Sequence, residues 1–129
     1  LAAGRPARPV ALGRPAASDA QDAARVAEIR ALMTRAVGVV REDADLAPAI
    51  ARLAELAFAA ASGRSTDAAL VGYLIAVAAR RRHESRGAHC RRDYPAALPE
   101  PAVHSQFTLA EARLLARSRD QQAQDVKIR

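Results

Sequence analysis

Apolar residues recur at helical spacing in three successive stretches and predict helices at about 19–37, 45–61 and 66–85. The first two helices each have one apolar face. These faces comprise Val26, Ile29, Met33 and Val37 in the first helix and Leu46, Ile50, Leu53 and Ala57 in the second. The third helix is apolar nearly all round from Ala68 to Ala79, which is typical of a helix buried on several sides.

Local signals mark the expected helix ends. Ser18 and Gln21 have the spacing of a capping box at the start of the first helix. Gly38 is placed to end that helix in a left-handed turn. Asp43 or Asp45 can cap the second helix.

A further short helix is predicted near the end of the chain. Thr108 and Glu111 repeat the capping-box spacing and predict a helix that continues to about residue 118. The stretch 86–106 contains Gly and several Pro residues and is predicted to be irregular. The predicted fold is therefore all-α: a three-helix antiparallel bundle with an irregular excursion and a short C-terminal helix.

The chain is expected to contain one domain. Residues 1–18 include three prolines and are predicted to be a linker. Residues 19–118 form the helical domain, and the polar residues 119–129 are predicted to be a flexible tail.

The basic charge of the chain does not by itself indicate a partner. The net charge is +6, and all but one of the 20 Lys and Arg residues are Arg. Such a balance is compatible with nucleic acid or acidic lipid. However, acidic residues are interspersed, aromatic residues make up only 3% of the chain, and no helix-turn-helix pattern is present. We expect no nucleic-acid partner, and a free-standing basic helical nucleic-acid-binding module remains the alternative.

The sequence also limits the compartment. The longest apolar run has twelve residues, from Ala68 to Ala79, whereas a membrane span needs about 20. Cys90 is the only cysteine, so an intrachain disulfide is impossible. We expect a cytoplasmic protein with no membrane partner.

The stretch 83–95 is the one segment dense in both charge and special backbone residues. Glu84 and Arg86 can tie a helix end to the following loop through charge-assisted hydrogen bonds, and Gly87 permits a left-handed turn. The surrounding donors suit an interface with another domain, a self-contained helix cap or a dicarboxylate site. The candidate interface residues are Glu84, Ser85, Arg86, Gly87, His89 and Arg92.

No catalytic, cofactor-binding or metal-binding residue can be assigned from motifs. The chain has no Gly-rich phosphate loop after a strand, no recognisable carboxylate pair and no nucleophile with a positioned base. His83, His89, Cys90 and His104 fit no common zinc spacing. We therefore expect no metal site.

Two motifs resemble a known family. Glu84–His89 reads Glu-Ser-Arg-Gly-Ala-His and 91–95 reads Arg-Arg-Asp-Tyr-Pro. Together they resemble the C-terminal helical domain of the succinate dehydrogenase and fumarate reductase flavoprotein family. The stretch 29–41, ending in Val-Gly-Val-Val-Arg, resembles the first helix of that domain. The motifs occur in the family's order, and the resemblance covers roughly residues 19–117.

The end of the chain resembles one branch of this family. A short Pro-rich link and Phe-Thr-Leu-Ala-Glu-Ala at 107–112 resemble the brief terminal helix of many aspartate oxidases. The same domain of a succinate dehydrogenase or fumarate reductase flavoprotein is the alternative. His83 departs from the family's usual Lys or Arg, and Cys90 stands where an aromatic residue is common.

The resemblance implies that residues 1–18 lead out of an FAD-binding domain that is outside this chain. That domain would hold FAD and, with its capping domain, the catalytic Arg and His residues. The whole enzyme would oxidise L-aspartate to iminoaspartate for NAD biosynthesis, and oxygen or fumarate would reoxidise the flavin. The resemblance thus implies a chain that is inactive alone and is held to its flavin domain by the stretch 83–95.

Overall fold

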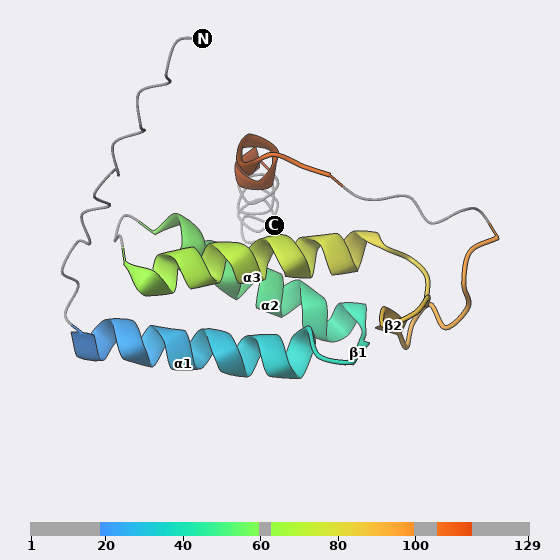
Figure 1. Cartoon of the computed structure of the whole chain (residues 1–129), viewed down its shortest axis with the longest axis horizontal. Coiled ribbons are helices and arrows are strands. Elements are labelled where there is room, and N and C mark those ends of the chain that lie inside the picture. Colours follow the sequence, from blue (N-terminus) through green and yellow to red (C-terminus); the bar gives the residue numbers. More distant parts are fainter. Residues whose placement is uncertain (1–18, 60–62, 100–105, 115–129) are drawn as a thin grey trace, which may run out of the picture.

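The computed structural model describes residues 19–59, 63–99 and 106–114. Within these residues, α1 (Asp19–Ala36), α2 (Asp43–Phe58) and α3 (Arg64–Arg81) run antiparallel in succession, which in Figure 1 is rightwards, leftwards and rightwards. In Figure 1, α1 and α3 lie side by side and α2 passes behind α3. The predicted all-α bundle is confirmed. No helix in this part of the chain is both long and apolar enough to cross a membrane.

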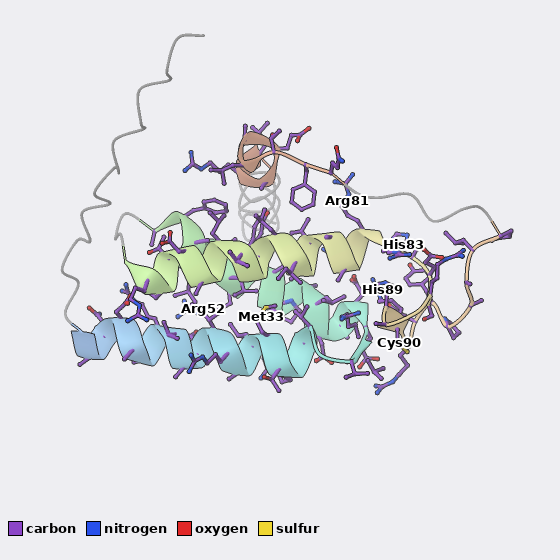
Figure 2. The ribbon with its side chains drawn as sticks, viewed as in Figure 1. Met33, Arg52, Arg81, His83, His89 and Cys90 are labelled. Atoms are coloured by element: carbon purple, nitrogen blue, oxygen red, sulfur yellow. The ribbon has the colours of Figure 1, made fainter. Side chains whose placement is uncertain are left out.

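Small side chains let the three helices approach closely. Gly72 of α3 lies where a Cβ atom would be 3.1 Å from Met33 Sδ and 3.3 Å from a methyl of Leu53. Met33 lies between α1 and α3 in Figure 2. The core around this point is made mostly of Ala, Leu and Ile residues from the three helices. Its buried members include Ile29, Leu46, Ala49, Ile50, Leu53, Ala69 and Ala76.

A short helical segment at 109–114 covers part of α3. The predicted capping box is confirmed: the Glu111 carboxylate accepts from the Thr108 amide at 2.6 Å, and the Thr108 hydroxyl accepts from the Glu111 amide at 3.3 Å. Tyr73 fixes this segment, because its buried hydroxyl donates to the Ala112 carbonyl at 3.0 Å. The Tyr73 ring also meets Phe58 edge to face.

Two very short strands close one end of the bundle. β1 (Val40–Arg41) and β2 (Cys90–Arg91) pair in parallel, with Val40 opposite Cys90. Figure 1 shows them beyond the end of α3, next to the start of α2. Each strand has two residues, too few for an alternating pattern, so the sequence did not predict them.

Several predicted helix ends were wrong. α3 ends at Arg81 instead of residue 85, because Arg82 is already extended. α2 begins at Asp43 and ends at Phe58 instead of spanning 45–61, and neither Asp43 nor Asp45 supplies a side-chain cap. Ser18, in the first predicted capping box, lies outside the described residues.

Gly38 has a different role from the predicted one. Among the described residues, a left-handed φ occurs only at Gly87, so Gly38 does not form a left-handed turn. Instead, a Cβ atom at Gly38 would lie 2.6 Å from the Thr34 carbonyl oxygen. Glycine is required here by the close approach of the chain to the end of α1.

Candidate functional site

The charged stretch folds back over the end of the bundle. We call residues 82–99 the fold-back segment. It leaves α3, turns at Gly87 with φ 58°, and returns through β2. Figure 2 shows His83, His89 and Cys90 together at this end of the molecule. The predicted left-handed turn at Gly87 is confirmed.

Arg91 is the centre of the segment. Only 1% of this residue is exposed, and it is among the largest fully buried side chains in the described residues. Its Nε and Nη2 atoms donate to the two carboxylate oxygens of Asp93 at 2.7 and 2.5 Å. Its Nη1 donates to the carbonyls of Ala79 and Arg80 at 3.2 and 3.1 Å. Arg91 therefore caps the C-terminal end of α3, where carbonyl groups lack helical partners.

Asp93 connects this arrangement to the start of α2. Its Oδ2 accepts from the amide of Asp43, the first residue of α2, at 3.0 Å. A carboxylate at this position satisfies a free amide and faces the positive end of the helix dipole. The hydrogen bonds from Arg91 hold the pKa of Asp93 well below its usual range.

A second ion pair joins α2 to α3. Arg80 Nε and Nη2 donate to the two Asp43 oxygens at 2.6 and 2.8 Å. The hydrogen bonds between Asp43 and Arg80 are the main cause of both pKa shifts. They lower the pKa of Asp43 and raise the pKa of Arg80. Arg80 and Arg91 thus bind carboxylates that both lie at the start of α2.

Glu84 is buried inside the fold-back segment with 4% exposure. It accepts from Arg82 Nε at 2.8 Å, from Arg86 Nε at 3.0 Å and from the Leu98 amide at 3.2 Å. The bonds from Arg86 and Arg82 lower the pKa of Glu84 to about 2. The expectation that Glu84 and Arg86 would tie a helix end to a loop is confirmed, with Arg86 Nη2 also donating to the Leu98 carbonyl at 2.6 Å.

Ser85 links the two arms of the segment. Its Oγ accepts from the Arg91 amide at 2.8 Å and can donate to the Tyr94 carbonyl at 2.8 Å. Its own amide donates to the Ala96 carbonyl at 2.9 Å. Because one hydroxyl serves as both acceptor and donor, the small polar side chain of Ser85 suits this position.

His89 contacts three parts of the chain. Its Nδ1 lies 3.1 Å from Arg41 Nη1, and its Nε2 lies 3.3 Å from the Arg82 carbonyl oxygen. Its backbone pairs with that of Arg86 on both sides of the Gly87 turn. Burial is the main cause that lowers the pKa of His89, and the nearby cations act in the same direction.

Arg92 differs from its neighbour Arg91. Its side chain is 69% exposed and contacts the Glu42 carboxylate at 3.2 Å. Its amide donates to the Arg41 carbonyl, which extends the β1–β2 contact. An exposed ion pair of this kind contributes little to stability.

All six predicted interface residues therefore lie in or beside one bonded cluster, and the contacts just described are made within the chain. Their role at an interface stays a prediction. The sequence analysis placed Arg91 and Asp93 in the family motif but selected neither as a candidate interface residue, although the two lie at the centre of the cluster. The available signal was their spacing, since an Arg and an Asp two residues apart can pair across a turn.

The other polar residues named from the sequence do not form a metal site in this part of the structure. Among the described residues, no group of three His, Cys, Asp or Glu side chains could hold a metal ion. His83 stacks on Tyr94 with ring centroids 4.6 Å apart, and Cys90 is half-buried. His104 lies outside the described residues.

The cluster is suited to holding segments together. Glu84 and Asp93 are bound by guanidinium groups that keep them ionised at neutral pH. A carboxylate in that state is a poor general acid, and its occupied oxygens are poorly placed to act as a general base. The arrangement therefore ties the ends of α1, α2 and α3 together.

Comparisons with known proteins identify the family. A family model described as fumarate reductase flavoprotein C-term matches residues 59–128. The L-aspartate oxidase of Rhodospirillum rubrum is 44% identical over 80 residues, which cover 62% of this chain and 29% of that protein. The enzyme of the same name from Agrobacterium fabrum is 43% identical over 95 residues, which cover 71% of this chain and 18% of that protein.

The relatives are much longer than the matched region. The match to L-aspartate oxidase of Xylella fastidiosa strain Temecula1, at 46% identity over 67 residues, covers 52% of this chain and only 13% of that protein. The chain thus spans less than a third of each of these relatives. No solved structure matches. Since the family model covers more than half of the chain, the protein belongs to the fumarate reductase flavoprotein C-terminal family.

Proposed function

We propose that this chain is the C-terminal helical domain of an L-aspartate oxidase. The observation that carries this proposal is the identity of 43% to the Agrobacterium fabrum L-aspartate oxidase over 95 residues, which include most of the helical domain. In the whole enzyme, a flavin domain binds FAD and oxidises L-aspartate to iminoaspartate, with oxygen or fumarate as acceptor. The enzyme is cytoplasmic and acts in NAD biosynthesis, and residues 1–18 are the linker from the flavin domain.

The geometry of the fold-back segment supports a non-catalytic role for this domain. Glu84 is enclosed by Arg82, Arg86 and the Leu98 amide, and Asp93 is bound by Arg91. A domain that contributes rigidity and surface, while the reaction takes place elsewhere, fits these occupied groups.

The fold-back segment is the proposed contact with the flavin domain. The candidate residues are Glu84, Ser85, Arg86, Gly87, His89 and Arg92, at the end of the bundle where α3 ends. Glu84 and Ser85 fix the shape of the segment from within, whereas the Arg92 side chain is largely exposed and pairs with Glu42 at the surface. In this arrangement, the buried members shape the surface and the exposed members contact the partner domain.

A domain exchange tests the proposal. The chain would replace the corresponding C-terminal region of the Agrobacterium fabrum enzyme, and aspartate-dependent formation of hydrogen peroxide would be measured with and without added FAD. We expect the exchanged enzyme to be active and an enzyme truncated before this region to be inactive or to lose FAD. Activity with succinate in place of aspartate would favour the dehydrogenase branch of the family.

The isolated chain provides the complementary measurement. We expect no oxidation of aspartate and no stoichiometric FAD binding by absorbance titration. Tight binding of one FAD per chain would overturn the assignment of the cofactor to another domain. Binding of duplex DNA that weakens steeply with salt would instead support a basic nucleic-acid-binding module. The structure disfavours such a module, because Arg80 is paired with Asp43 and Arg82 with Glu84.

A further inference from the structure

His89 is held in one protonation state by its two partners. Arg41 has only N–H donors, so Nδ1 of His89, 3.1 Å from Arg41 Nη1, must accept and carry no proton. The opposite nitrogen, Nε2, lies 3.3 Å from the Arg82 carbonyl, which can only accept. The ring is therefore neutral, with its single proton on Nε2.

The neutral ring joins segments that are far apart in the sequence. Arg41 lies in β1, and its Nε donates to the Val37 carbonyl next to the end of α1 at 3.2 Å. The Arg82 carbonyl belongs to the residue that ends α3. His89 itself closes the turn at Gly87 and precedes β2. One imidazole thus connects the ends of two helices to the fold-back segment.

Protonation of His89 would replace its hydrogen bond with Arg41 by a repulsion between two cations. A proton on Nδ1 would point at the N–H groups of Arg41, so that a hydrogen bond becomes a contact between two cations. The charged groups that face His89 are Arg41 from β1, Arg82 from the end of α3 and Arg91 from β2. Glu84 binds Arg82 and Asp93 binds Arg91, whereas no ion pair of Arg41 is found among the described residues.

We propose that His89 is a pH-operated latch, which in its neutral form holds the fold-back segment against β1 and the end of α3 and which on protonation loses its bond to Arg41 in β1 while keeping the one to the Arg82 carbonyl. This inference is independent of the reaction of the whole enzyme. Burial and the surrounding guanidinium groups both lower the pKa of His89 from its ordinary value of 6.5. The free imidazole of the unfolded chain therefore binds a proton at a higher pH than the folded one.

Because the pKa of His89 is lower in the folded chain than in the unfolded chain, acid destabilises the fold. Above about pH 6.5, both the folded and the unfolded chain carry neutral His89, and the latch contributes its full stability. As the pH falls below this value, the unfolded chain binds protons that the folded chain resists, and stability is lost. The loss stops growing once the folded ring is itself protonated.

The direct test is a proton NMR titration of the full 129-residue chain. We expect the His89 ring to titrate at a lower pH than histidine in a short unstructured peptide. The Arg92 amide, which donates to the Arg41 carbonyl between the two strands, should lose protection from hydrogen exchange as the ring titrates. Titration of His89 at or above the peptide value would overturn the proposal.

Variants separate the latch from a merely structural histidine. Thermal midpoints would be compared at about pH 7.5 and about pH 5.5, on either side of the ordinary histidine pKa. We expect the wild-type midpoint to fall over this interval by several degrees, the His83→Gln control to retain that fall, and His89→Gln to lose most of it. Arg41→Gln should raise the pH at which His89 titrates, whereas Arg41→Lys should not. An equal fall in wild type and His89→Gln would refute the latch.

Discussion

At the scale of single residues, Arg91 shows how a buried cation can be tolerated. Its side chain is fully enclosed, yet the two carboxylate oxygens of Asp93 and two helix carbonyls accept its N–H groups. Among the described residues, no buried side-chain nitrogen or oxygen lacks a hydrogen-bond partner. The desolvation cost of the guanidinium is therefore offset by one bidentate ion pair and by capping of α3.

We expect Arg91→Met to be strongly destabilising. Methionine fills a similar volume, but it leaves Asp93 without its ion pair and the Ala79 and Arg80 carbonyls without this donor. Breaking such a pair should lower the free energy of unfolding by roughly 3 kcal/mol, the low end of the usual range because Asp93 keeps some contact with solvent. Arg91→Lys should be intermediate, since the single nitrogen of an ammonium group cannot reproduce the planar fork that binds Asp93 and the helix carbonyls together.

Urea denaturation of the variants provides the measurement. The adjacent Arg92→Met is a matched control, because Arg92 is largely exposed and its substitution should change stability by less than about 0.5 kcal/mol. Equal losses in the two variants would show that the buried cluster around Arg91 does not stabilise the fold.

The sequence alone does not show which of the adjacent residues Arg91 and Arg92 is buried. Successive side chains of a strand point to opposite sides, so the side of β2 that faces the bundle decides which of two adjacent arginines is buried. A strand of two residues gives no pattern from which that side can be read. Gly87 and Glu84 could be predicted, because a turn and a short-range ion pair depend only on neighbouring residues.

At the scale of elements, the helix ends are completed mostly by distant parts of the chain. The start of α2 receives the Asp93 carboxylate, and the end of α3 receives the Arg91 guanidinium. The start of α3 receives the carboxylate of Asp22 in α1, which accepts from the Ser65 amide at 3.0 Å. The Thr108–Glu111 box was predicted because both partners are local, whereas these three caps depend on tertiary contacts.

The Asp22 cap can be tested by its effect on stability and on its pH dependence. Hydrogen bonds with Ser65 lower the pKa of Asp22 from its ordinary 3.8. The cap therefore stabilises the fold fully above that value, and its contribution is lost as the pH falls through the lower folded pKa. We expect Asp22→Ala to reduce the thermal midpoint at neutral pH, with the difference from wild type shrinking in acid.

Asp22→Asn is the informative companion, because its amide oxygen can still accept from the Ser65 N–H. It should lose less stability than Asp22→Ala at neutral pH. Hydrogen exchange at the Ser65 amide should be faster in Asp22→Ala alone. Wild-type exchange at that amide in Asp22→Ala would mean that another group caps α3.

At the scale of the whole molecule, the fold-back segment compensates for a core with few large side chains. Periodicity alone predicted the three helices, since their apolar faces are continuous. It did not predict that one irregular segment joins the end of α1, the start of α2 and the end of α3 through His89, Asp93 and Arg91.

Arg86 distinguishes an internal tie from a contact with the flavin domain. Its bonds to Glu84 and to the Leu98 carbonyl give it a role inside the chain, so Arg86→Ala should lower the stability of the isolated domain. If the segment also contacts the flavin domain, the same substitution in the exchanged Agrobacterium fabrum enzyme should additionally speed the loss of FAD on dilution. Arg52→Ala is the matched control, because Arg52 pairs with Glu28 and Glu55 outside the segment. Equal FAD retention in both exchanged variants, together with reduced stability of the isolated Arg86→Ala domain, would assign Arg86 to the internal tie alone.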